Sequence, residues 1–337
     1  MKTVSPTLIT SNNVNGAFRE AFWKLRTMGV PEESRNGPVL VMPGPVITTF
    51  LNPLQRVLFN PVRDANPVFH LMEAIWMLAG RDDVGFLLPF NSGYDSYAEL
   101  DGTVHGAYGD RWRNAFGIDQ IYAIIYMLKR DPKSRQAVMQ MWSSAAEDCN
   151  DLVGEWKDRP CNTHIYFDRR YDQLNMTVCC RSNDVVWGAY GANIVHFSIL
   201  QELIALALGV PIGAYCQMSN NFHAYTDLPV VKHFIESPPF EDCDAYTDVR
   251  GARPEPLLQP GERWEDFLSD CESFCDNEPT RCNFFENVAQ PLRAAYVNRK
   301  AGDTEWRSFL RGVPKDNDWK IAFNEWVARR DGEKQRV

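Results

Sequence analysis

Residues 163–180 read THIYFDRRYDQLNMTVCC, and the organisation of the chain is clearest there. Two runs rich in β-branched, aromatic and other apolar residues, 163–167 and 174–180, flank the polar segment 168–173. Two such runs joined by a short polar connection are typical of a β-hairpin. The sequence therefore predicts two antiparallel strands, with Cys161 just before the first and the tetrapeptide RSND directly after the second.

Helices and further strands are predicted on both sides of this hairpin. Apolar residues at helical spacing, or longer apolar runs closed by Gly or Pro, indicate four helices. Shorter apolar stretches punctuated by Pro and Gly indicate strands. The predicted helices are 17–28, 68–78, 118–128 and 194–208, and the predicted strands lie within 39–58 and over 136–142.

The composition of the chain changes beyond Pro238, where Pro, Asp, Glu and Cys become frequent up to about Cys282. Apolar residues return at helical spacing in the tail, 306–330. We therefore expect a catalytic domain over 1–237 and a C-terminal helical extension over 238–337 that packs on it.

The charge balance limits the kinds of partner. The chain has 337 residues and a formal net charge of −9. Because affinity for DNA or RNA rests on neutralising many phosphates, an acidic chain is a poor general binder of nucleic acid. A few arginines can still hold one small phosphate ester. We expect a small anionic substrate and no nucleic-acid polymer.

Cysteine usage and hydropathy indicate the compartment. Nine cysteines without a C-x-x-C pair fit neither a disulfide framework nor a zinc site. A reduced, cytoplasmic protein with buried thiols and no metal is expected. No uninterrupted apolar run approaches the roughly 18 residues that span a bilayer, so no membrane partner is expected either.

Several polar residues stand where chemistry is expected. Cys161 lies at a strand edge, where a thiol is more often a small buried apolar group than a nucleophile. Glu73 lies inside the apolar helix 68–78, and a carboxylate there needs a partner or a chemical task. The other polar groups follow in a fixed order, namely Tyr94, Tyr108, Arg135, Arg181, Ser182, Asp184, Asn193, Asn221, His223 and Tyr225.

In this order and at these separations, the residues resemble the thymidylate synthase family and its phage relatives, the deoxypyrimidine monophosphate hydroxymethylases. The resemblance covers about residues 50–235, and RSNDVV at 181–186 looks most like the hydroxymethylase branch. It implies an α/β (α+β) fold with a mixed, largely antiparallel sheet covered by helices, and a homodimer formed through the sheet. It also implies 5,10-methylenetetrahydrofolate as cofactor, a deoxypyrimidine monophosphate as substrate and, for a phage protein, the host cytoplasm as location.

The resemblance assigns chemical roles to four residues. Cys161 matches the family nucleophile, whose thiolate adds to carbon 6 of the pyrimidine and makes carbon 5 reactive. A thiolate needs a lowered pKa, which nearby arginines are expected to supply. Glu73 matches the glutamate that organises water and moves protons at the base and the folate. Asp184 matches the carboxylate that holds the folate pterin, and Tyr108 matches a proton-relay tyrosine.

Five further residues match positions that hold the phosphate and the sugar. Arg181 and Ser182 match groups that bind the phosphate. Arg135 matches an arginine that reaches the phosphate across the dimer interface, a task suited to a planar guanidinium. His223 and Tyr225 match the pair that hydrogen-bonds the sugar 3′-hydroxyl.

Asn193 matches the asparagine that reads the base. In the family it donates to O4 and accepts from N3–H of uracil, whereas the cytosine hydroxymethylase of phage has aspartate at this place. Asn193 therefore favours dUMP. The chain has one extra residue between Gly188 and Asn193 relative to either pattern, and a rotated amide also fits cytosine, so dCMP (or CMP) stays open as a substrate.

Other departures from the family pattern bear on the product. Tyr94 stands near the place of a tryptophan that shields the methylene intermediate from water, and the C-terminus does not look like the synthase tail that closes over the folate. A loosened shield favours capture by water, hence a hydroxymethylase, with a methylase that uses hydride from the folate as the alternative. Asn162, Gln136 and Cys180 also replace a histidine, a second phosphate-binding arginine and a glutamine.

Two alternatives come from other functional classes. One is a catalytically dead family member that only binds nucleotide or RNA, and the retained Cys161, Glu73, Arg181 and Asp184 argue against it. The other is an unrelated thiol hydrolase that uses Cys161 with His164 or His223, and cleavage of esters or peptides without folate would support it.

Overall fold

The computed structural model describes residues 4–334 except 145–149 and 238–242. Within those ranges eight strands form one sheet in the order β1-β4-β8-β7-β6-β5, and the hairpin β2-β3 joins it through β8. The strands are β1 (Thr7–Ser11), β2 (Val30–Ser34), β3 (Gly37–Val41), β4 (Val46–Phe50), β5 (Val138–Gln140), β6 (Asn162–Arg170), β7 (Gln173–Asp184) and β8 (Ile212–Tyr225). The pairs β1–β4 and β7–β8 are parallel and the other pairs are antiparallel, which confirms the predicted mixed, largely antiparallel sheet.

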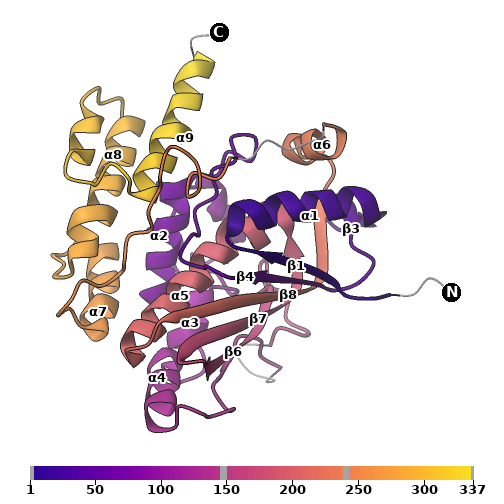
Figure 1. Ribbon diagram of the computed structural model, residues 1–337, viewed down its shortest axis with the longest axis horizontal. Coiled ribbons are helices and arrows are strands. Elements are labelled where there is room, and N and C mark those ends of the chain that lie inside the picture. Colours follow the sequence, from indigo (N-terminus) through magenta and orange to yellow (C-terminus); the bar gives the residue numbers. More distant parts are fainter. Residues whose placement is uncertain (1–3, 145–149, 238–242, 335–337) are drawn as a thin grey trace.

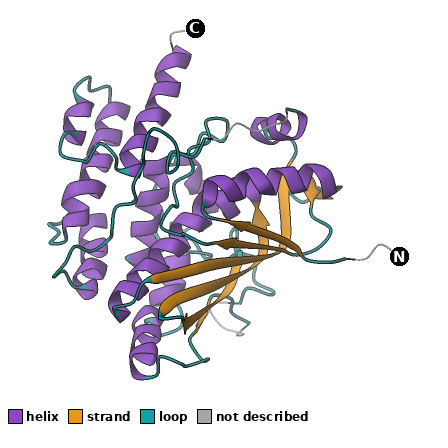
Figure 2. Ribbon diagram, viewed as in Figure 1, coloured by secondary structure: helices purple, strands orange, loops and turns teal. Residues whose placement is uncertain are grey.

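Helices gather mainly on one side of this sheet (Figure 2), as the predicted fold class requires. Figure 1 places α2 and α5 close to the sheet and α7, α8 and α9 farther out. The helices are α1 (Val14–Met28), α2 (Pro67–Leu78), α3 (Tyr108–Arg113), α4 (Gln120–Arg130), α5 (Asn193–Leu208), α6 (Pro229–Glu236), α7 (Trp264–Cys275), α8 (Gln290–Lys300) and α9 (Asp318–Lys334). A π-helix, Val185–Ala192, leads directly into α5.

The predicted hairpin is confirmed, and its strands are longer than expected. Arg170 pairs with Gln173, so only Tyr171 and Asp172 form the turn. Both turn residues have φ of +55°, the left-handed conformation that a two-residue hairpin turn needs to match the strand twist. The polar segment 168–173 therefore lies mostly in strands. It forms the last residues of β6 and the first of β7, which are exposed and tolerate polar side chains.

The predicted helices are confirmed with small shifts at their ends, and the shifts follow capping residues. The Asn13 side chain accepts from the backbone N–H groups of Asn15 and Gly16, so α1 begins earlier than expected. The Asp119 side chain caps α4 in the same way. The predicted strand 136–142 shortens to β5, which pairs with β6 and forms one edge of the sheet among the described strands.

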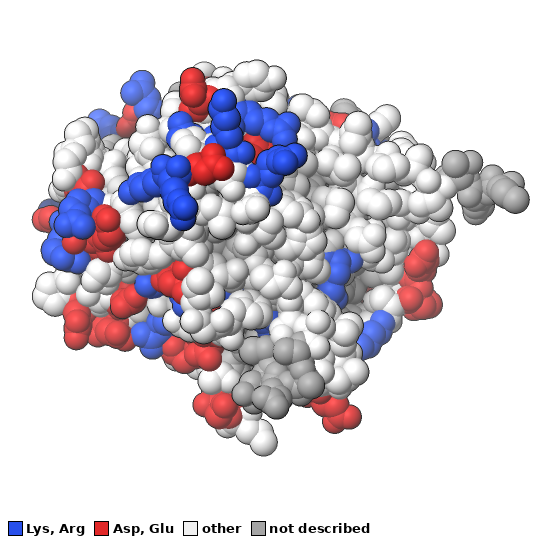
Figure 3. Space-filling model, turned by 90° about the horizontal axis from the view of Figure 1, so that it is seen from below, with Lys and Arg blue, Asp and Glu red and all other residues white. Residues whose placement is uncertain are grey.

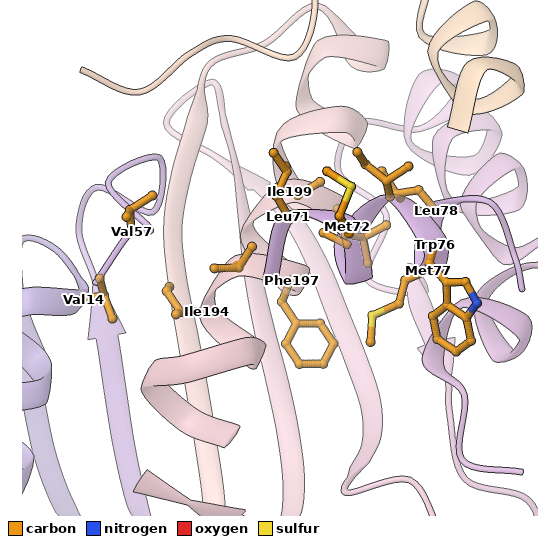
Figure 4. Close-up of a cluster of buried hydrophobic side chains, with 14 of the residues drawn as sticks. Val14, Val57, Leu71, Met72, Trp76, Met77, Leu78, Ile194, Phe197 and Ile199 are labelled. Carbon is orange, nitrogen blue, oxygen red and sulfur yellow. The ribbon is translucent and has the colours of Figure 1, made fainter. Parts of the chain in front are cut away.

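The core lies between the sheet and the pair α2 and α5. Figure 4 shows Leu71 and Met72 of α2 beside Ile199 of α5, with Phe197 below them. Leu71 and Phe197 are fully buried, and a buried side chain of this size contributes roughly 1.5–3 kcal/mol. Because α2 is buried on nearly all sides, a polar group on it is held in a fixed place.

The C-terminal helices are tied back to the first part of the chain. The Asp64 carboxylate accepts from Arg329 Nε at 2.8 Å and from a terminal nitrogen of Arg330 at 2.7 Å. Tyr246 Oη donates to Asp318 at 2.8 Å and accepts from the backbone N–H of Val57 at 3.1 Å. The expected boundary between 237 and 238 adjoins residues 238–242, which lie outside the described ranges.

One continuous helix, Val185–Leu208, is long and apolar enough to cross a membrane by length and composition. The helix reaches this length because the π-helix and α5 run on as one helix, and polar residues such as His196, Gln201 and Glu202 interrupt its apolar sequence. Of its most apolar window, 83% is buried inside the protein. Such burial is typical of a core helix.

Candidate active site

A cavity of about 400 Å³ lies between α2, the end of β7, the start of α5 and β8. The elements that surround it are far apart in the sequence and are brought together by the sheet order. Nine of the predicted site residues line it, namely Glu73, Tyr94, Tyr108, Cys161, Ser182, Asp184, Asn193, His223 and Tyr225. Two predicted site residues, Arg135 and Arg181, are not among the described residues that line the cavity.

Cys161 is half-buried at the end of the loop that precedes β6. Arg181 holds this loop: its backbone N–H donates to the Cys161 carbonyl at 2.9 Å, and its guanidinium donates to the carbonyls of Pro160 (3.0 Å) and Arg159 (3.1 Å). Burial raises the pKa of the Cys161 thiol, and the charge of Arg181 offsets only part of this. The expected lowered pKa is therefore wrong, because loss of hydration outweighs the arginine.

Glu73 projects from α2 into the cavity and is 5% exposed. Tyr94 Oη donates to Glu73 Oε1 at 2.8 Å, and His196 Nε2 lies 2.9 Å from Glu73 Oε2. Burial, with the nearby Glu73 charge, raises the pKa of Tyr94 well above its ordinary value, so Tyr94 stays a donor. His196 is missed by sequence reasoning, although it follows Asn193 by one turn on a largely apolar helix and so shares its face.

Asp184 ends β7 and caps the π-helix. Its Oδ1 accepts from the backbone N–H groups of Val186 (2.8 Å) and Trp187 (2.6 Å). Its Oδ2 is buried and has no hydrogen-bond partner among the described residues. Burial raises the pKa of Asp184 to about 6, so the carboxyl group changes protonation near neutral pH. The Arg63 guanidinium lies 4.7 Å from the ring centre of Trp187 on the same wall.

The extra residue before Asn193 is absorbed by the π-helix. The Asn193 backbone N–H donates to the carbonyl of Gly188, five residues earlier. A π turn holds one residue more than an α turn and often occurs at functional sites. Asn193 therefore still lines the cavity despite the insertion.

His223 and Tyr225 lie near the end of β8. His223 Nδ1 is 2.8 Å from Asn221 Oδ1, which fixes the plane of the imidazole ring. Asn36 Nδ2 donates to Tyr225 Oη at 3.4 Å and brings the β2-β3 turn to this side of the cavity.

Arg135 lies apart from the cavity. It is exposed and lines a shallow hollow with Lys133 and Gln136. One copy of the chain therefore does not bring Arg135 to Cys161. Its phosphate-binding role stays a prediction that needs a second subunit.

Asp158 and His70 also line the cavity and are missed by sequence reasoning. Burial raises the pKa of Asp158 to about 6 and lowers the pKa of His70 well below its ordinary value. In the sequence Asp158 belongs to a charged stretch that reads as surface. His70 reads as one polar position on a buried helix.

A buried ion pair holds the segment that ends at Cys161. Two terminal nitrogens of Arg111 donate to Asp151 Oδ2 (2.7 Å) and Oδ1 (3.0 Å), and both residues are 1% exposed. His105 Nε2 lies 2.8 Å from Asp151 Oδ1, and its ring stacks on Trp156 at 3.9 Å between centres. These contacts fix the chain between Asp151 and the nucleophile.

Asp151→Asn should lower the free energy of unfolding by about 3–5 kcal/mol, because it leaves the buried Arg111 charge without its partner. Urea unfolding followed by tryptophan fluorescence measures the change. The matched control is Asp168→Asn at the exposed ion pair with Arg170, whose effect should stay within about 1 kcal/mol. Equal stabilities of the two variants would contradict a structural role for Asp151.

Comparisons with known proteins agree with this geometry. The family model for thymidylate synthase matches residues 63–244. A deoxyuridylate hydroxymethyltransferase of Pseudomonas phage M6 is 41% identical over 341 aligned residues, 96% of this chain and 94% of that protein. A deoxyuridylate hydroxymethyltransferase of Bacillus phage SP01 is 39% identical over 194 residues, 54% of this chain and 50% of that protein.

The fold is similar to that of a solved structure as well. The crystal structure of thymidylate synthase from T4 phage has a TM-score of 0.54 and 20% identity, over 66% of this chain and 82% of that one. The family match covers more than half of the chain, and the phage M6 relative aligns along nearly all of it. The chain belongs to the thymidylate synthase family.

Proposed function

We propose that this protein transfers a hydroxymethyl group to carbon 5 of dUMP, with 5,10-methylenetetrahydrofolate as the one-carbon donor. The observation that carries the proposal is one cavity lined by a thiol (Cys161), a buried carboxylate (Glu73) and an amide suited to a pyrimidine edge (Asn193). Relatives named deoxyuridylate hydroxymethyltransferase support the choice of base and of product.

The first chemical step belongs to Cys161. Its sulfur adds to carbon 6 of the ring, which makes carbon 5 nucleophilic. The folate supplies a carbon at the oxidation level of formaldehyde. Carbon 5 bonds to this carbon and loses its proton as the carbon–nitrogen bond to the folate breaks and tetrahydrofolate departs. Water then provides the hydroxyl oxygen, and departure of the sulfur restores the ring double bond. We propose that Ser182, which lines the cavity, binds the phosphate together with Arg181, whose guanidinium also donates to the carbonyls of Pro160 and Arg159.

The cavity wall fits the cofactor. The unpartnered Oδ2 of Asp184 is an acceptor for the paired N–H donors of a pterin. Trp187 is 55% exposed on the same wall and offers a flat apolar surface to an aromatic ring.

Capture by water needs a base, and Glu73 is suited to that task. Tyr94 donates to one carboxylate oxygen, and His196 Nε2 lies 2.9 Å from the other, which has no hydrogen-bond partner among the described residues and so can accept from a water molecule. A tyrosine hydroxyl and an imidazole also make this side of the cavity polar. These groups support hydroxymethyl rather than methyl as the product.

The test is incubation with tetrahydrofolate and formaldehyde, with dUMP and dCMP in parallel, followed by product mass. A gain of one CH2O on dUMP supports the proposal. A gain of CH2 indicates a methylase, and modification of dCMP alone changes the substrate. Nucleotide binding without turnover indicates an inactive family member. Ester or peptide cleavage without folate indicates a thiol hydrolase, although no hydrogen bond joins Cys161 to His164 or His223 among the described residues.

Asn193→Asp should raise the preference for dCMP relative to dUMP by at least about tenfold, since a carboxylate accepts from the cytosine amino group and repels O4 of uracil. The ratio of kcat/KM on the two nucleotides measures this. An unchanged ratio means that Asn193 does not read the base.

We also propose that the active unit is a homodimer formed through the open face of the sheet. Alternate side chains on the strands point away from the helices, and strand pairing aligns them in two rows. The first row consists of Val138, Tyr166, Thr177, Cys216, Thr49 and Thr10. The second row consists of Gln140, His164, Cys179, Met218, Ile47 and Leu8. These side chains carry no carboxylate, lysine or arginine, so a second copy can cover them without burying an unpaired formal charge.

Mixing two inactive variants tests both the dimer and Arg135. Arg135→Ala should impair phosphate binding in the partner's site, and Cys161→Ala removes the nucleophile of its own site. A mixed dimer contains one site with both groups intact, so an exchanged equal mixture should recover roughly a quarter of wild-type activity. No recovery, or a fully active monomer in sedimentation experiments, would contradict the proposal.

For the chain as a whole, we propose a catalytic domain over 1–237 and a helical extension over 238–337 that braces it, acting in the host cytoplasm. The ion pairs from Asp64 to Arg329 and Arg330 support the bracing role.

On the face in Figure 3, basic side chains are interleaved with acidic ones and much of the surface is uncharged. This distribution supports a small phosphate ester rather than a nucleic-acid polymer as the partner.

A further inference from the structure

A buried chain of hydrogen bonds stands behind Asn193. Its Nδ2 donates to Asn183 Oδ1 at 3.1 Å, and Asn183 Nδ2 donates to Ser219 Oγ at 3.0 Å. The exposed fractions of Asn193, Asn183 and Ser219 are 5%, 2% and 1%. The three residues come from α5, β7 and β8, so the contact depends on how the sheet and the helix pack. One N–H of Asn193 is thereby used, and the second N–H and the carbonyl oxygen remain for a ligand.

The direction of the Asn193 amide decides which base it fits. Uracil presents the acceptor O4 beside the donor N3–H, whereas cytosine presents an amino donor beside the acceptor N3. An asparagine side chain offers one donor and one acceptor side by side, and turning it by half a turn exchanges them. Base preference therefore requires something that prevents the turn.

We propose that Asn183 sets the base preference, because it holds the Asn193 amide in the orientation that reads uracil. This inference rests on the proposed function of the same site. A half turn of Asn193 would bring its oxygen against Asn183 Oδ1, and two facing acceptors without a proton between them are unfavourable. The clash is relieved only if Asn183 turns as well and the Ser219 hydroxyl becomes the donor. The three side chains therefore turn together or not at all.

Gly188 gives Asn183 the room that this arrangement needs. A methyl group on Gly188 would lie 2.5 Å from Asn183 Oδ1, closer than a carbon and an oxygen can approach. The carbonyl of Gly188 accepts the backbone N–H of Asn193 in the π turn. The same turn thus fixes the backbone of Asn193 and leaves space for the residue that orients its side chain.

The test compares kcat/KM on dCMP and on dUMP in three variants. Asn183→Ala frees the Asn193 amide and should raise the dCMP-to-dUMP ratio at least about tenfold. Asn183→Asp presents only acceptors to Asn193, so it should keep the wild-type preference. Gly188→Ala displaces the Asn183 side chain without removing a polar group, and it should change the ratio in the same direction as Asn183→Ala. An unchanged ratio in both alanine variants overturns the inference.

A matched control separates base preference from general damage. Asn317 is also buried, at 1% exposed, and its side chain accepts from the backbone N–H of Lys320 at the start of α9. Asn317→Ala should leave the ratio unchanged even if it lowers stability. Calorimetric binding of dUMP and dCMP to the wild type separates the two proposals. A wild type that binds neither nucleotide overturns the proposed function, whereas a dUMP preference that both alanine variants retain overturns only the role of Asn183.

Discussion

Cys161→Ala should lower turnover of dUMP by at least about four orders of magnitude, or about 5 kcal/mol of transition-state stabilisation. The loss is large because addition of the sulfur to carbon 6 is the step that makes carbon 5 reactive, and the hydroxymethyl transfer cannot begin without it. The neighbouring thiol of Cys180 does not replace it, because that side chain is 2% exposed and burial holds its pKa well above the ordinary value. Product mass under single-turnover conditions is the measurement.

The control for this variant is Cys282→Ala, which removes another buried thiol far along the chain and should leave turnover within about twofold. The affinity of Cys161→Ala for dUMP should also stay near that of the wild type, because phosphate and sugar contacts come from other residues. Undiminished turnover of the alanine variant would end the proposed mechanism.

The raised pKa of the Cys161 thiol adds an expectation about this step. A thiol that is protonated at neutral pH must lose its proton before it attacks, and Arg181 favours the thiolate only in part. The sequence shows the charged neighbour of Cys161 but not how deeply the thiol is buried, so the pKa expected from the sequence is too low. Desolvation depends on how the loop packs against the rest of the chain, and no local pattern reports that.

Much of the fold could be predicted because its signals are local. The two apolar runs around the polar segment 168–173, the apolar helix around Glu73 and the glycine after α5 each identify an element from a few neighbouring residues. Gly209 ends α5 with φ of +65°, as a glycine at a helix C-terminus commonly does. Capping residues such as Asn13, which the apolar pattern does not reveal, shift the ends of the predicted elements without changing their type.

The pairs that complete the site could not be predicted, because each depends on topology. Asn183 meets Ser219 only because β7 and β8 pair in parallel after a crossover through α5, with Ser182 opposite Asn221 in register. His196 meets Glu73 because α2 and α5 pack side by side. A polar residue on an apolar helix signals that it has a partner, but the partner is chosen by the packing of elements distant in sequence.

Glu73→Gln should lower turnover by about 10²–10⁴-fold, since general acid–base catalysis typically contributes that much. The dissociation constant of dUMP should change far less, because the amide keeps the shape of the carboxylate and loses mainly its capacity to accept a proton. Glu272→Gln, at an exposed ion pair with Arg113, is the matched control and should leave both quantities unchanged. The product also matters: if Glu73 activates the water that completes the hydroxymethyl group, the variant should accumulate the covalent Cys161 adduct, which mass spectrometry of the denatured protein detects. Equal losses in affinity and turnover, with no adduct, would mean that Glu73 holds the nucleotide rather than moving a proton.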